Sequence, residues 1–299
     1  MMEEAGLNLS GFLKNLAARG IENQRKESEE AGGPPDYIGE DGLLYCGKCH
    51  TPKQTILTGE FFPEPLKVAT TCKCRQEAEE RRKAEEQARA DMEQIKRLRI
   101  NSLMDEKFRE STFDTFRQTK NNARNLRLCR RYAEAFPEMV KKNQGLLMYG
   151  NVGTGKTFAA ACIANYLLDR KVPTVMTSFV KIVDSADLKN RETANAFISR
   201  LNRARLLIID DLGAERGTDY ALERVYDIID SRYRARLPMI LTTNLTVDEM
   251  MKCSDIRYSR IYDRIFEVCY PMEFKGTSWR KAEAARRFDD MEKFLEGTL

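Results

Sequence analysis

Residues 150–157 read GNVGTGKT and fit the pattern G-x-x-x-x-G-K-[ST], whose chemistry is the binding of a phosphate chain. Its glycines allow a loop whose backbone N–H groups surround phosphate oxygens, and a following helix adds partial positive charge. Lys156 would reach the β- and γ-phosphates, and the Thr157 hydroxyl would bind Mg²⁺. The predicted nucleotide-binding residues are Gly150, Asn151, Val152, Gly153, Thr154, Gly155, Lys156, Thr157 and Phe158.

Acidic residues at the end of a second buried strand complete such a site. The run LLIIDD ends in Asp210 and Asp211. Asp210 is predicted to hold Mg²⁺, mostly through water, and Asp211 to orient or activate the attacking water, with Glu215 as a weaker candidate. Two adjacent carboxylates at this place repel each other and lose hydration, and the free-energy cost is high unless a cation lies nearby. Asn244 ends a third apolar run, PMILTTN, and is predicted to sense the γ-phosphate; the alternative is a turn former.

Four of the eight cysteines are clustered as C-x₂-C (Cys46, Cys49) and, about twenty residues later, C-x-C (Cys72, Cys74). Four thiolates are what a closed tetrahedral zinc site needs. A redox pair is disfavoured because it should open a helix in a thioredoxin-like unit, and disulfides are disfavoured in cytoplasm. His50, the only histidine, is awkwardly placed beside Cys49. The predicted zinc site is therefore structural, stabilising a segment with few large hydrophobic residues.

A sheet must position the phosphate-binding residues. Short apolar or β-branched runs at 145–150, 173–179, 206–210, 238–244 and 266–272 alternate with helix-like segments. This alternation predicts an α/β fold in which a parallel sheet is sandwiched by helices. The motif at 150–157 follows the first of these strands and precedes FAAACIANYLL, so its context is strand, loop, helix.

The chain is predicted to have three parts. Residues 1–74 form an N-terminal partner-binding domain with the four-cysteine zinc site, 75–99 form a charged helical linker, and 100–299 form the nucleotide-binding domain. In the first part, leucines and Phe12 at helical spacing predict a short helix within 7–19, and the polar stretch 22–36 is interpreted as a linker. The 75–99 stretch mixes both charges without Gly or Pro, as exposed helices do.

Composition sets further expectations. The chain has 299 residues, 42% of them hydrophobic, and a net charge of only +4, so nucleic-acid binding would depend on local patches. The N-terminus has acidic residues where a signal peptide needs basic ones, and no apolar run approaches the roughly 20 residues that span a bilayer. We expect a cytoplasmic protein with no membrane partner. The remaining cysteines, Cys129, Cys162, Cys253 and Cys269, are predicted to be reduced core residues.

Together the stretches GNVGTGKTFAAACIANYL, LLIIDDLGAE, YDIIDSRYRARLPMILTTNL and SRIYDRI, with STFDTF at 111–116 before them, resemble AAA+ ATPases. More narrowly, they resemble the DnaC/DnaI-type bacterial or phage helicase loaders and the related IstB-type transposition helpers. The resemblance implies an AAA+ ATPase domain over 100–299 that uses ATP/ADP and Mg²⁺ and self-associates on ATP binding. It also implies partners: a hexameric DnaB-type replicative helicase, docked by the zinc domain, and single-stranded DNA.

The family also supplies candidate arginines. A basic residue from a neighbouring subunit completes the site, and Arg260 in SRIYDRI best matches it; Arg264, four residues on, shares its helical face and is the alternative. Either arginine could instead pair with Asp255 or Asp263. TSWR at 277–280 resembles the motif of the second sensor arginine, which makes Arg280 its candidate.

Two features depart from the general AAA+ plan. About twenty residues follow TSWR, enough for one helix, so the helical lid is expected to be reduced or absent. Asp211 stands where many AAA+ proteins have Glu. Together these features imply slow, switch-like hydrolysis rather than a processive motor.

Two basic runs are candidates for contact with single-stranded DNA. One comprises Arg124, Arg127, Arg130 and Arg131; the other comprises Arg232, Arg234 and Arg236, with Tyr233 or Phe179 as stacking residues. The alternative is a solvated helix face with the aromatic residues in the core. Two alternative functions also remain open: an IstB-like transposition helper ATPase, and a zinc-dependent DNA-binding protein switched by nucleotide.

Overall fold

The computed structural model describes residues 2–30, 33–59, 62–183, 191–213 and 219–297. The chain divides into two compact units, residues 1–90 and 91–299. No helix in the described ranges is both long enough and apolar enough to cross a membrane. Glu215, the weaker candidate for activating water, lies outside the described residues.

The first unit combines one long helix with small strands. Helix α1 (Met2–Glu30) packs on β4 (Phe62–Ala69), which pairs antiparallel with β3 (Gln54–Gly59). Strands β1 (Tyr37–Ile38) and β2 (Leu44–Tyr45) form a second antiparallel pair. The interpretation of 22–36 as a linker is wrong, because the helix continues to Glu30. Glu, Gln, Lys and Arg are strong helix formers, so their polarity there does not indicate a break.

The charged segment after the cysteines is helical, as expected. Helix α2 (Lys73–Asn101) has no buried residue among its 29 and includes several i,i+4 ion pairs, such as Arg97 with Glu93. Such pairs each stabilise an exposed helix by only about 0.2–0.5 kcal/mol, but the sequence repeats them without a Gly or Pro to interrupt the helix. The turn η1 (Glu106–Phe108) follows α2.

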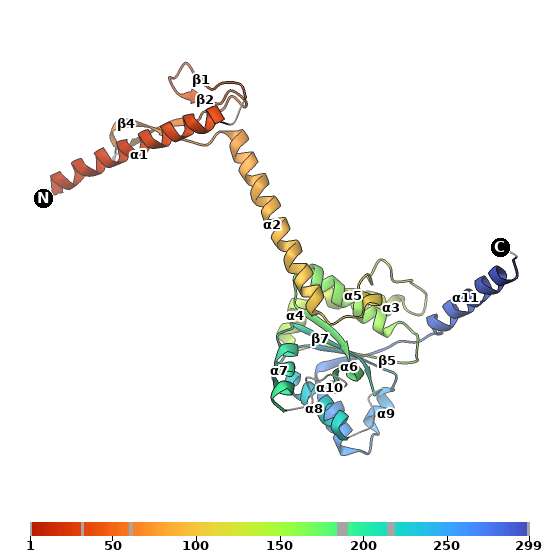
Figure 1. Cartoon of the computed structure of the whole chain (residues 1–299). Coiled ribbons are helices and arrows are strands. Elements are labelled where there is room, and N and C mark those ends of the chain that lie inside the picture. Colours follow the sequence, from red (N-terminus) through yellow and green to blue (C-terminus); the bar gives the residue numbers. More distant parts are fainter. Residues whose placement is uncertain (1, 31–32, 60–61, 184–190, 214–218, 298–299) are drawn as a thin grey trace. The chain divides into compact units, whose positions relative to one another are not determined.

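A five-stranded parallel sheet forms the centre of the second unit (Figure 1). Its order is β6-β7-β8-β5-β9, and every neighbouring pair is parallel. The strands are β5 (Gly145–Tyr149), β6 (Thr174–Ser178), β7 (Leu206–Leu212), β8 (Met239–Thr243) and β9 (Cys269–Glu273). Four of the five predicted strands are confirmed within a few residues. The fifth begins later than predicted, because residues 266–268 belong to the preceding helix.

Helices cover both faces of this sheet, which confirms the predicted α/β sandwich (Figure 1). Because successive strand residues point to opposite faces, Leu146 and Met148 of β5 join one core and Leu147 joins the other. The first core contains α3 (Ala123–Glu134), α4 (Phe136–Lys142) and α5 (Lys156–Asp169). The second contains α6 (Phe179–Val183), α7 (Arg191–Asn202), α8 (Asp219–Arg234), α9 (Val247–Met251) and α10 (Ile256–Val268).

After β9 the described chain forms one further helix, α11 (Trp279–Leu295), as expected for a reduced lid. Ser278 caps it by accepting a hydrogen bond from Lys281 N at 3.4 Å. α11 has no buried residue.

Candidate nucleotide site and cysteine cluster

The phosphate-binding motif forms the turn from β5 into α5. Gly150, Gly153 and Gly155 have φ of 128°, 80° and 97°, a region that side chains disfavour. A Cβ on Gly150 would also lie 2.5 Å from Phe274 O, so no larger residue fits there. Gly155 caps α5, and the N-terminus of this helix therefore opens into the loop.

Lys156 links the loop to the neighbouring strand β8. Its buried ammonium donates to Gly150 O (2.7 Å), Asn151 O (2.9 Å) and Asn244 Oδ1 (2.9 Å). Burial lowers the pKa of Lys156, and the nearby carboxylates of Asp210 and Asp211 oppose that effect. The structure thus brings together Lys156 and Asn244, which lie 88 residues apart in sequence.

Thr157 and Asp210 meet at the end of β7. Thr157 Oγ1 donates to Asp210 Oδ1 at 2.8 Å, and the Thr242 hydroxyl donates to the same oxygen. Burial raises the pKa of Asp210, although both hydroxyl donors favour its ionised form. A hydroxyl and a carboxylate oxygen side by side are ligands that suit Mg²⁺, so these two residues fit the predicted metal.

Asp211 lies in a local irregularity of the sheet. Its φ is 59°, a left-handed conformation that is uncommon for a residue other than glycine, and the β7–β8 register shifts between Ile209 and Leu212. Asp211 N donates to Thr242 Oγ1 at 3.0 Å, which fixes the bulge. Bulges next to active sites redirect side chains, and here two consecutive carboxylates project near Lys156.

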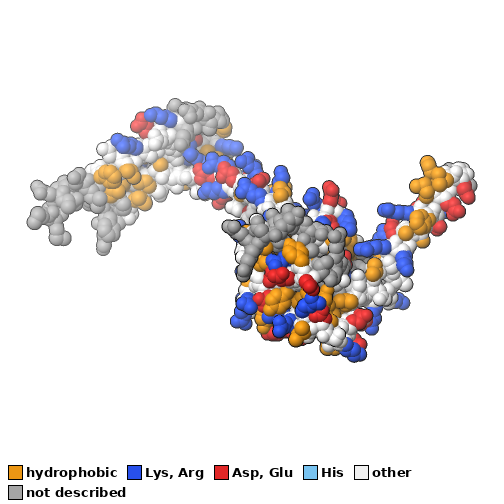
Figure 2. Space-filling model, turned by 60° about the horizontal axis from the view of Figure 1, so that its bottom comes forward, with side chains coloured by type: hydrophobic (Ala, Val, Ile, Leu, Met, Phe, Trp, Pro, Cys, Tyr) orange, Lys and Arg blue, Asp and Glu red, His pale blue; other side chains and the backbone are white. Residues whose placement is uncertain are grey.

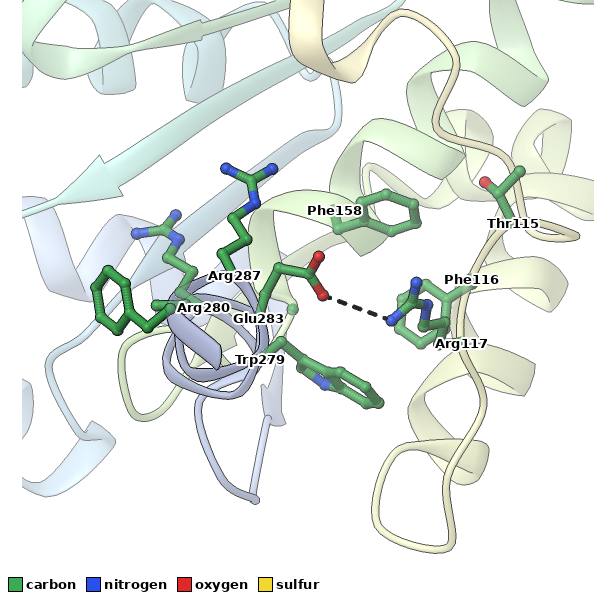
Figure 3. A pocket seen from close by; sticks show the side chains of 11 residues that line it. Thr115, Phe116, Arg117, Phe158, Trp279, Arg280, Glu283 and Arg287 are labelled. Carbon is green, nitrogen blue, oxygen red and sulfur yellow. Dashed lines mark ion pairs between the residues drawn. The ribbon is translucent and has the colours of Figure 1, made fainter. Parts of the chain in front are cut away.

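A cavity of about 630 Å³ opens beside the loop (Figure 3). Residues 115–117 face the side chains of α11 across it, and Phe116 meets Phe158 edge to face at 5.6 Å. Arg117 forms a 3.8 Å ion pair with Glu283 of α11. A mostly apolar cavity of this size next to a phosphate loop suits the base and sugar of a nucleotide. Of its lining, the sequence predicted Gly155, Phe158 and Arg280. The STFDTF stretch was the signal for Thr115 and Phe116, and the other residues of α11 had none.

Helix α11 begins directly against the phosphate loop. Trp279 N donates to Gly153 O at 2.9 Å, and a Cβ on Gly153 would lie 2.1 Å from Ser278 Oγ. The exposed Arg280 follows, lines the cavity and lowers the pKa of Lys156 through its charge. The structure therefore places the predicted second sensor arginine beside the phosphate loop.

The sequence profile of the IstB-like ATP binding proteins matches residues 72–286. The chain belongs to this family. It is 28% identical over 228 residues to the phage-like element PBSX protein XkdC of Bacillus subtilis (strain 168), across 72% of this chain and 77% of that protein. It is 27% identical over 152 residues to the replicative helicase loader DnaI of the same strain, across 46% and 48% of the two chains.

A crystal structure of DnaI is similar to 60% of this chain and 97% of its own, with 25% identity and a TM-score of 0.50. These comparisons confirm the family resemblance that the motifs indicated, and they also confirm the predicted AAA+ fold. Members of the IstB-like family are generally ATPases.

The two candidate arginines of α10 in this IstB-like domain, Arg260 and Arg264, differ in their contacts. Arg264 donates to Asp230 Oδ1 at 2.8 Å and to the Tyr226 hydroxyl at 3.0 Å, so it is held within its own chain. Its partner is neither Asp255 nor Asp263, the pairings considered from sequence. Arg260 is exposed, and its guanidinium makes no hydrogen bond or ion pair with any residue in the described ranges. Arg260 is thus the one available to a neighbouring molecule.

Two of the candidate DNA contacts are corrected. Arg232 is fully buried and donates to four backbone carbonyls, and Phe179 is also fully buried, so neither can touch DNA. Arginine is rarely buried without a paired carboxylate, and nothing in the basic run at 232–236 indicates that its first member is buried. The basic residues of α3 are exposed: Arg124, Arg127, Arg130 and Arg131. In Figure 2, both charge signs are interspersed over this unit.

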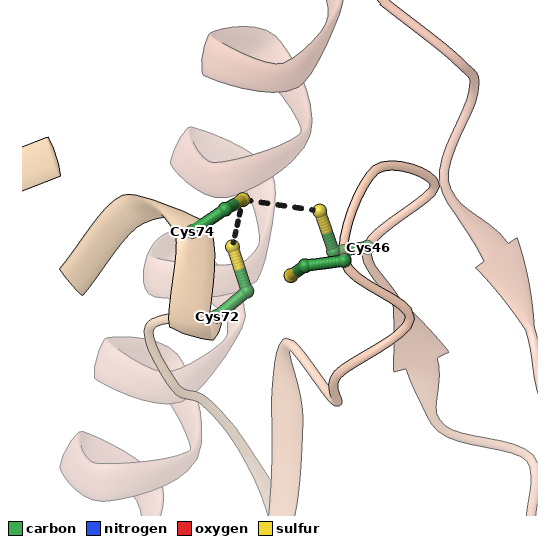
Figure 4. A group of neighbouring side chains, drawn as sticks. Cys46, Cys72 and Cys74 are labelled. Carbon is green, nitrogen blue, oxygen red and sulfur yellow. Dashed lines mark hydrogen bonds between the residues drawn. The ribbon is translucent and has the colours of Figure 1, made fainter. Parts of the chain in front are cut away.

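The four predicted zinc ligands lie together in the first unit (Figure 4). Their sulfurs all fall within 4.8 Å of one another, with Cys74 at 3.6 Å from Cys46 and 3.5 Å from Cys72. A tetrahedral site with Zn–S bonds of about 2.3 Å separates its sulfurs by about 3.8 Å, so the cluster fits zinc. All eight cysteines, each within the described ranges, are free, which excludes the disulfide alternative in this structure.

The turn between Cys46 and Cys49 is built for this role. A Cβ on Gly47 would lie 2.3 Å from Pro35 O, and Gly47 N donates to Asp36 Oδ1 at 3.1 Å. The Thr51 hydroxyl lowers the pKa of Cys49 to about 5, whereas burial raises the pKa of Cys74 to about 12. Crowded thiolates oppose one another's ionisation, and a bound divalent cation would remove that opposition.

Proposed function

We propose that this protein is an ATP-dependent loader of a hexameric replicative helicase onto single-stranded DNA. The observation that carries the proposal is the group formed by Lys156, Asn244 and the Thr157–Asp210 pair at one edge of the sheet, in a chain of the IstB-like family. The similarity to a replicative helicase loader, DnaI, supports the choice of process. Repeated cycles of ATP binding would then switch the chain between helicase-bound and released states.

The residues of the site have distinct roles in this proposal. Lys156 and the loop N–H groups bind the phosphates, and Thr157 and Asp210 hold Mg²⁺, which offsets phosphate charge when bound. Asp211 orients or activates water, and Asn244 senses the γ-phosphate. Asn244 accepts a hydrogen bond from Lys156, and the charges of Asp210 and Asp211 act on the pKa of the same ammonium group, so all three residues lie close to it.

Two arginines would complete the site. Arg280 acts within the chain, since it lines the cavity beside the phosphate loop. Arg260 acts on the site of a neighbouring molecule, which gives self-association on ATP binding a function; its exposure and lack of a partner in the described ranges support this. A single-helix lid and Asp211 in place of Glu favour slow turnover suited to a switch.

The zinc-stabilised part, residues 1–74, is proposed to dock the helicase, residues 75–99 to connect, and residues 100–299 to carry the AAA+ site. Zinc would be held by Cys46, Cys49, Cys72 and Cys74, whose sulfur spacing supports this ligand set. Its contribution is structural stability, because four protein ligands leave no position for a substrate.

The test measures ATP hydrolysis by the full-length protein, with and without single-stranded DNA and the host's replicative helicase. We expect slow hydrolysis that these partners change, and its loss in Lys156→Ala. The tagged full-length protein should capture the helicase from host lysate with ATP. Recovery of a transposase instead would favour the transposition helper. DNA binding that responds to nucleotide, with no hydrolysis under any condition, would favour the DNA-binding switch.

A further inference from the structure

Asn165 is a buried polar residue of α5 that the phosphate chemistry does not use. Only 2% of it is exposed, and the buried residues around it on this helix are mainly Ala, Cys, Ile and Leu. Asn is a poor helix former, so its place in the third turn needs another reason. Its amide Nδ2 donates to Phe108 O and to Ser111 O, both at 2.8 Å. Its Oδ1 accepts from Arg99 Nη1 at 3.3 Å.

These bonds belong to a longer contact between α5 and residues 99–117, which we name the strap. At the C-terminal end of α5, Asp169 pairs with Arg99 at 2.6 Å. Further along, Tyr166 meets Phe113 of the strap edge to face at 5.9 Å. Residues 158, 165, 166 and 169 share one helical face, so the strap runs antiparallel along α5.

The strap ends at the nucleotide cavity. At the N-terminal end of α5, Phe116 of the strap meets Phe158 at 5.6 Å, and residues 115–117 form one wall of the cavity (Figure 3). Both N–H groups of the Asn165 amide donate to strap carbonyls, those of Ser111 and Phe108, which lie four and seven residues before that wall in the sequence. In the described part of the molecule this amide is the hydrogen-bonding link from the middle of α5 to the strap.

We propose that Asn165 is a positioning residue for nucleotide binding: it fixes the strap so that Phe116 holds the base side of the cavity. It touches neither phosphate nor metal, and it acts only through the strap. The inference rests on the proposed ATP site and adds which residue makes that site recognise a nucleoside rather than a bare phosphate chain.

The test compares two ligands, ATP and inorganic triphosphate, by calorimetric titration of the full-length protein with Mg²⁺. Inorganic triphosphate can use the phosphate loop but has no base to fill the cavity. Asn165→Leu keeps the side chain's size and removes both donors. We expect its ATP affinity to fall about tenfold while its triphosphate affinity stays within about twofold, because one lost net hydrogen bond corresponds to roughly a factor of ten.

A matched control is Asn202→Leu, which also removes a part-buried amide bond, from Nδ2 to Ser231 Oγ at 2.6 Å, but on α7 away from the strap. It should leave both affinities unchanged. Where Asn165→Leu does not fold, Asn165→Asp replaces it, since Asp keeps the volume and the acceptor for Arg99 but lacks the two donors. The double variant of Asn165→Leu with Phe116→Ala should bind ATP no more weakly than Phe116→Ala alone.

Three results would overturn the inference. An equal loss for both ligands would make Asn165 a purely structural residue. Full additivity of the two substitutions would show that Asn165 does not act through Phe116. A wild-type protein that binds triphosphate as tightly as ATP would leave the cavity without a base-binding role. Binding of neither ligand by the wild type would instead refute the proposed ATP site itself, and this inference with it.

Discussion

Replacing Arg232 of α8 by Met should destabilise the second unit without a direct effect on DNA binding. The guanidinium is fully buried and donates to Ala204 O at 2.8 Å and to Arg205 O and Pro238 O at 3.0 Å each, with a longer contact of 3.5 Å to Leu201 O. It therefore joins the end of α7, the start of β7 and the start of β8.

The magnitude follows from those bonds. Each buried carbonyl left without its donor costs about 1–3 kcal/mol, so the three shorter bonds suggest about 3–9 kcal/mol. Removing a buried charge offsets part of this, because burial already disfavours the charged form and lowers the Arg232 pKa to about 9. We expect a net loss of about 3–5 kcal/mol, near the top of the range for single substitutions.

The assay is thermal unfolding of the nucleotide-free protein by circular dichroism. For a unit of this size, about 2–4 °C per kcal/mol predicts a decrease in Tm of about 6–20 °C. The control is Arg234→Met on the same helix, whose side chain is 74% exposed and pairs with Asp230 at 2.8 Å. The Arg234 side of this pair is in solvent, and Asp230 keeps its bond to Arg264, so the pair contributes at most about 1 kcal/mol and the Tm of this variant should change little.

Binding of a fluorescent single-stranded oligonucleotide is measured in parallel, well below the lowered Tm. Arg232→Met should bind like the wild type there. A Tm within about 2 °C of the wild type would refute the energetic reasoning. Weakened DNA binding with an unchanged Tm would return Arg232 to the surface that the sequence first suggested.

Three further predictions follow from the two sites. Asp210→Asn should raise the Tm of the nucleotide-free protein and abolish hydrolysis. Burial raises the pKa of Asp210, so ionisation of this carboxyl destabilises the folded protein as pH rises through that pKa, and Asn does not ionise. A lower Tm would contradict this reasoning. Arg260→Ala should leave Tm unchanged but reduce ATP turnover at concentrations where the protein self-associates, whereas Arg264→Ala should lower Tm by breaking its bond to Asp230; the reverse pattern would exchange their roles. A strong chelator should release one zinc ion per chain and make residues 33–74 sensitive to protease, and undiminished resistance with no zinc measured would refute the metal site.

Much of the nucleotide site was predictable because its signals are local. The spacing of Gly and Lys in 150–157 specifies a loop and a helix start, and an apolar run that ends in Asp210 specifies a buried strand with its acidic tip. Parallel strands bring such tips to one edge, which is why Asn244 and Lys156 meet at 2.9 Å. The cysteine spacing likewise predicted a cluster whose sulfurs lie within 4.8 Å.

Other features were not predictable because they depend on residues far apart in sequence. The extension of α1 to Glu30 is a different case, because the Glu, Gln, Lys and Arg residues of 22–30 are strong helix formers and gave a local signal for it. The base side of the cavity is formed by Phe116 and by α11, which are separated by more than 150 residues. No periodicity in either segment indicates the other.

The sequence by itself determined the phosphate-loop motif, the cysteine cluster and the parallel sheet, because glycine conformations, cysteine spacing and the apolar pattern of strands are properties of short segments. Only the tertiary structure decided which polar residues are available to other molecules. Arg232 and Arg234 lie two apart on one helix, yet one is fully buried and the other exposed. The physical reason is that burial and hydrogen-bond partners are set by what packs against a residue, and the sequence around it does not state that.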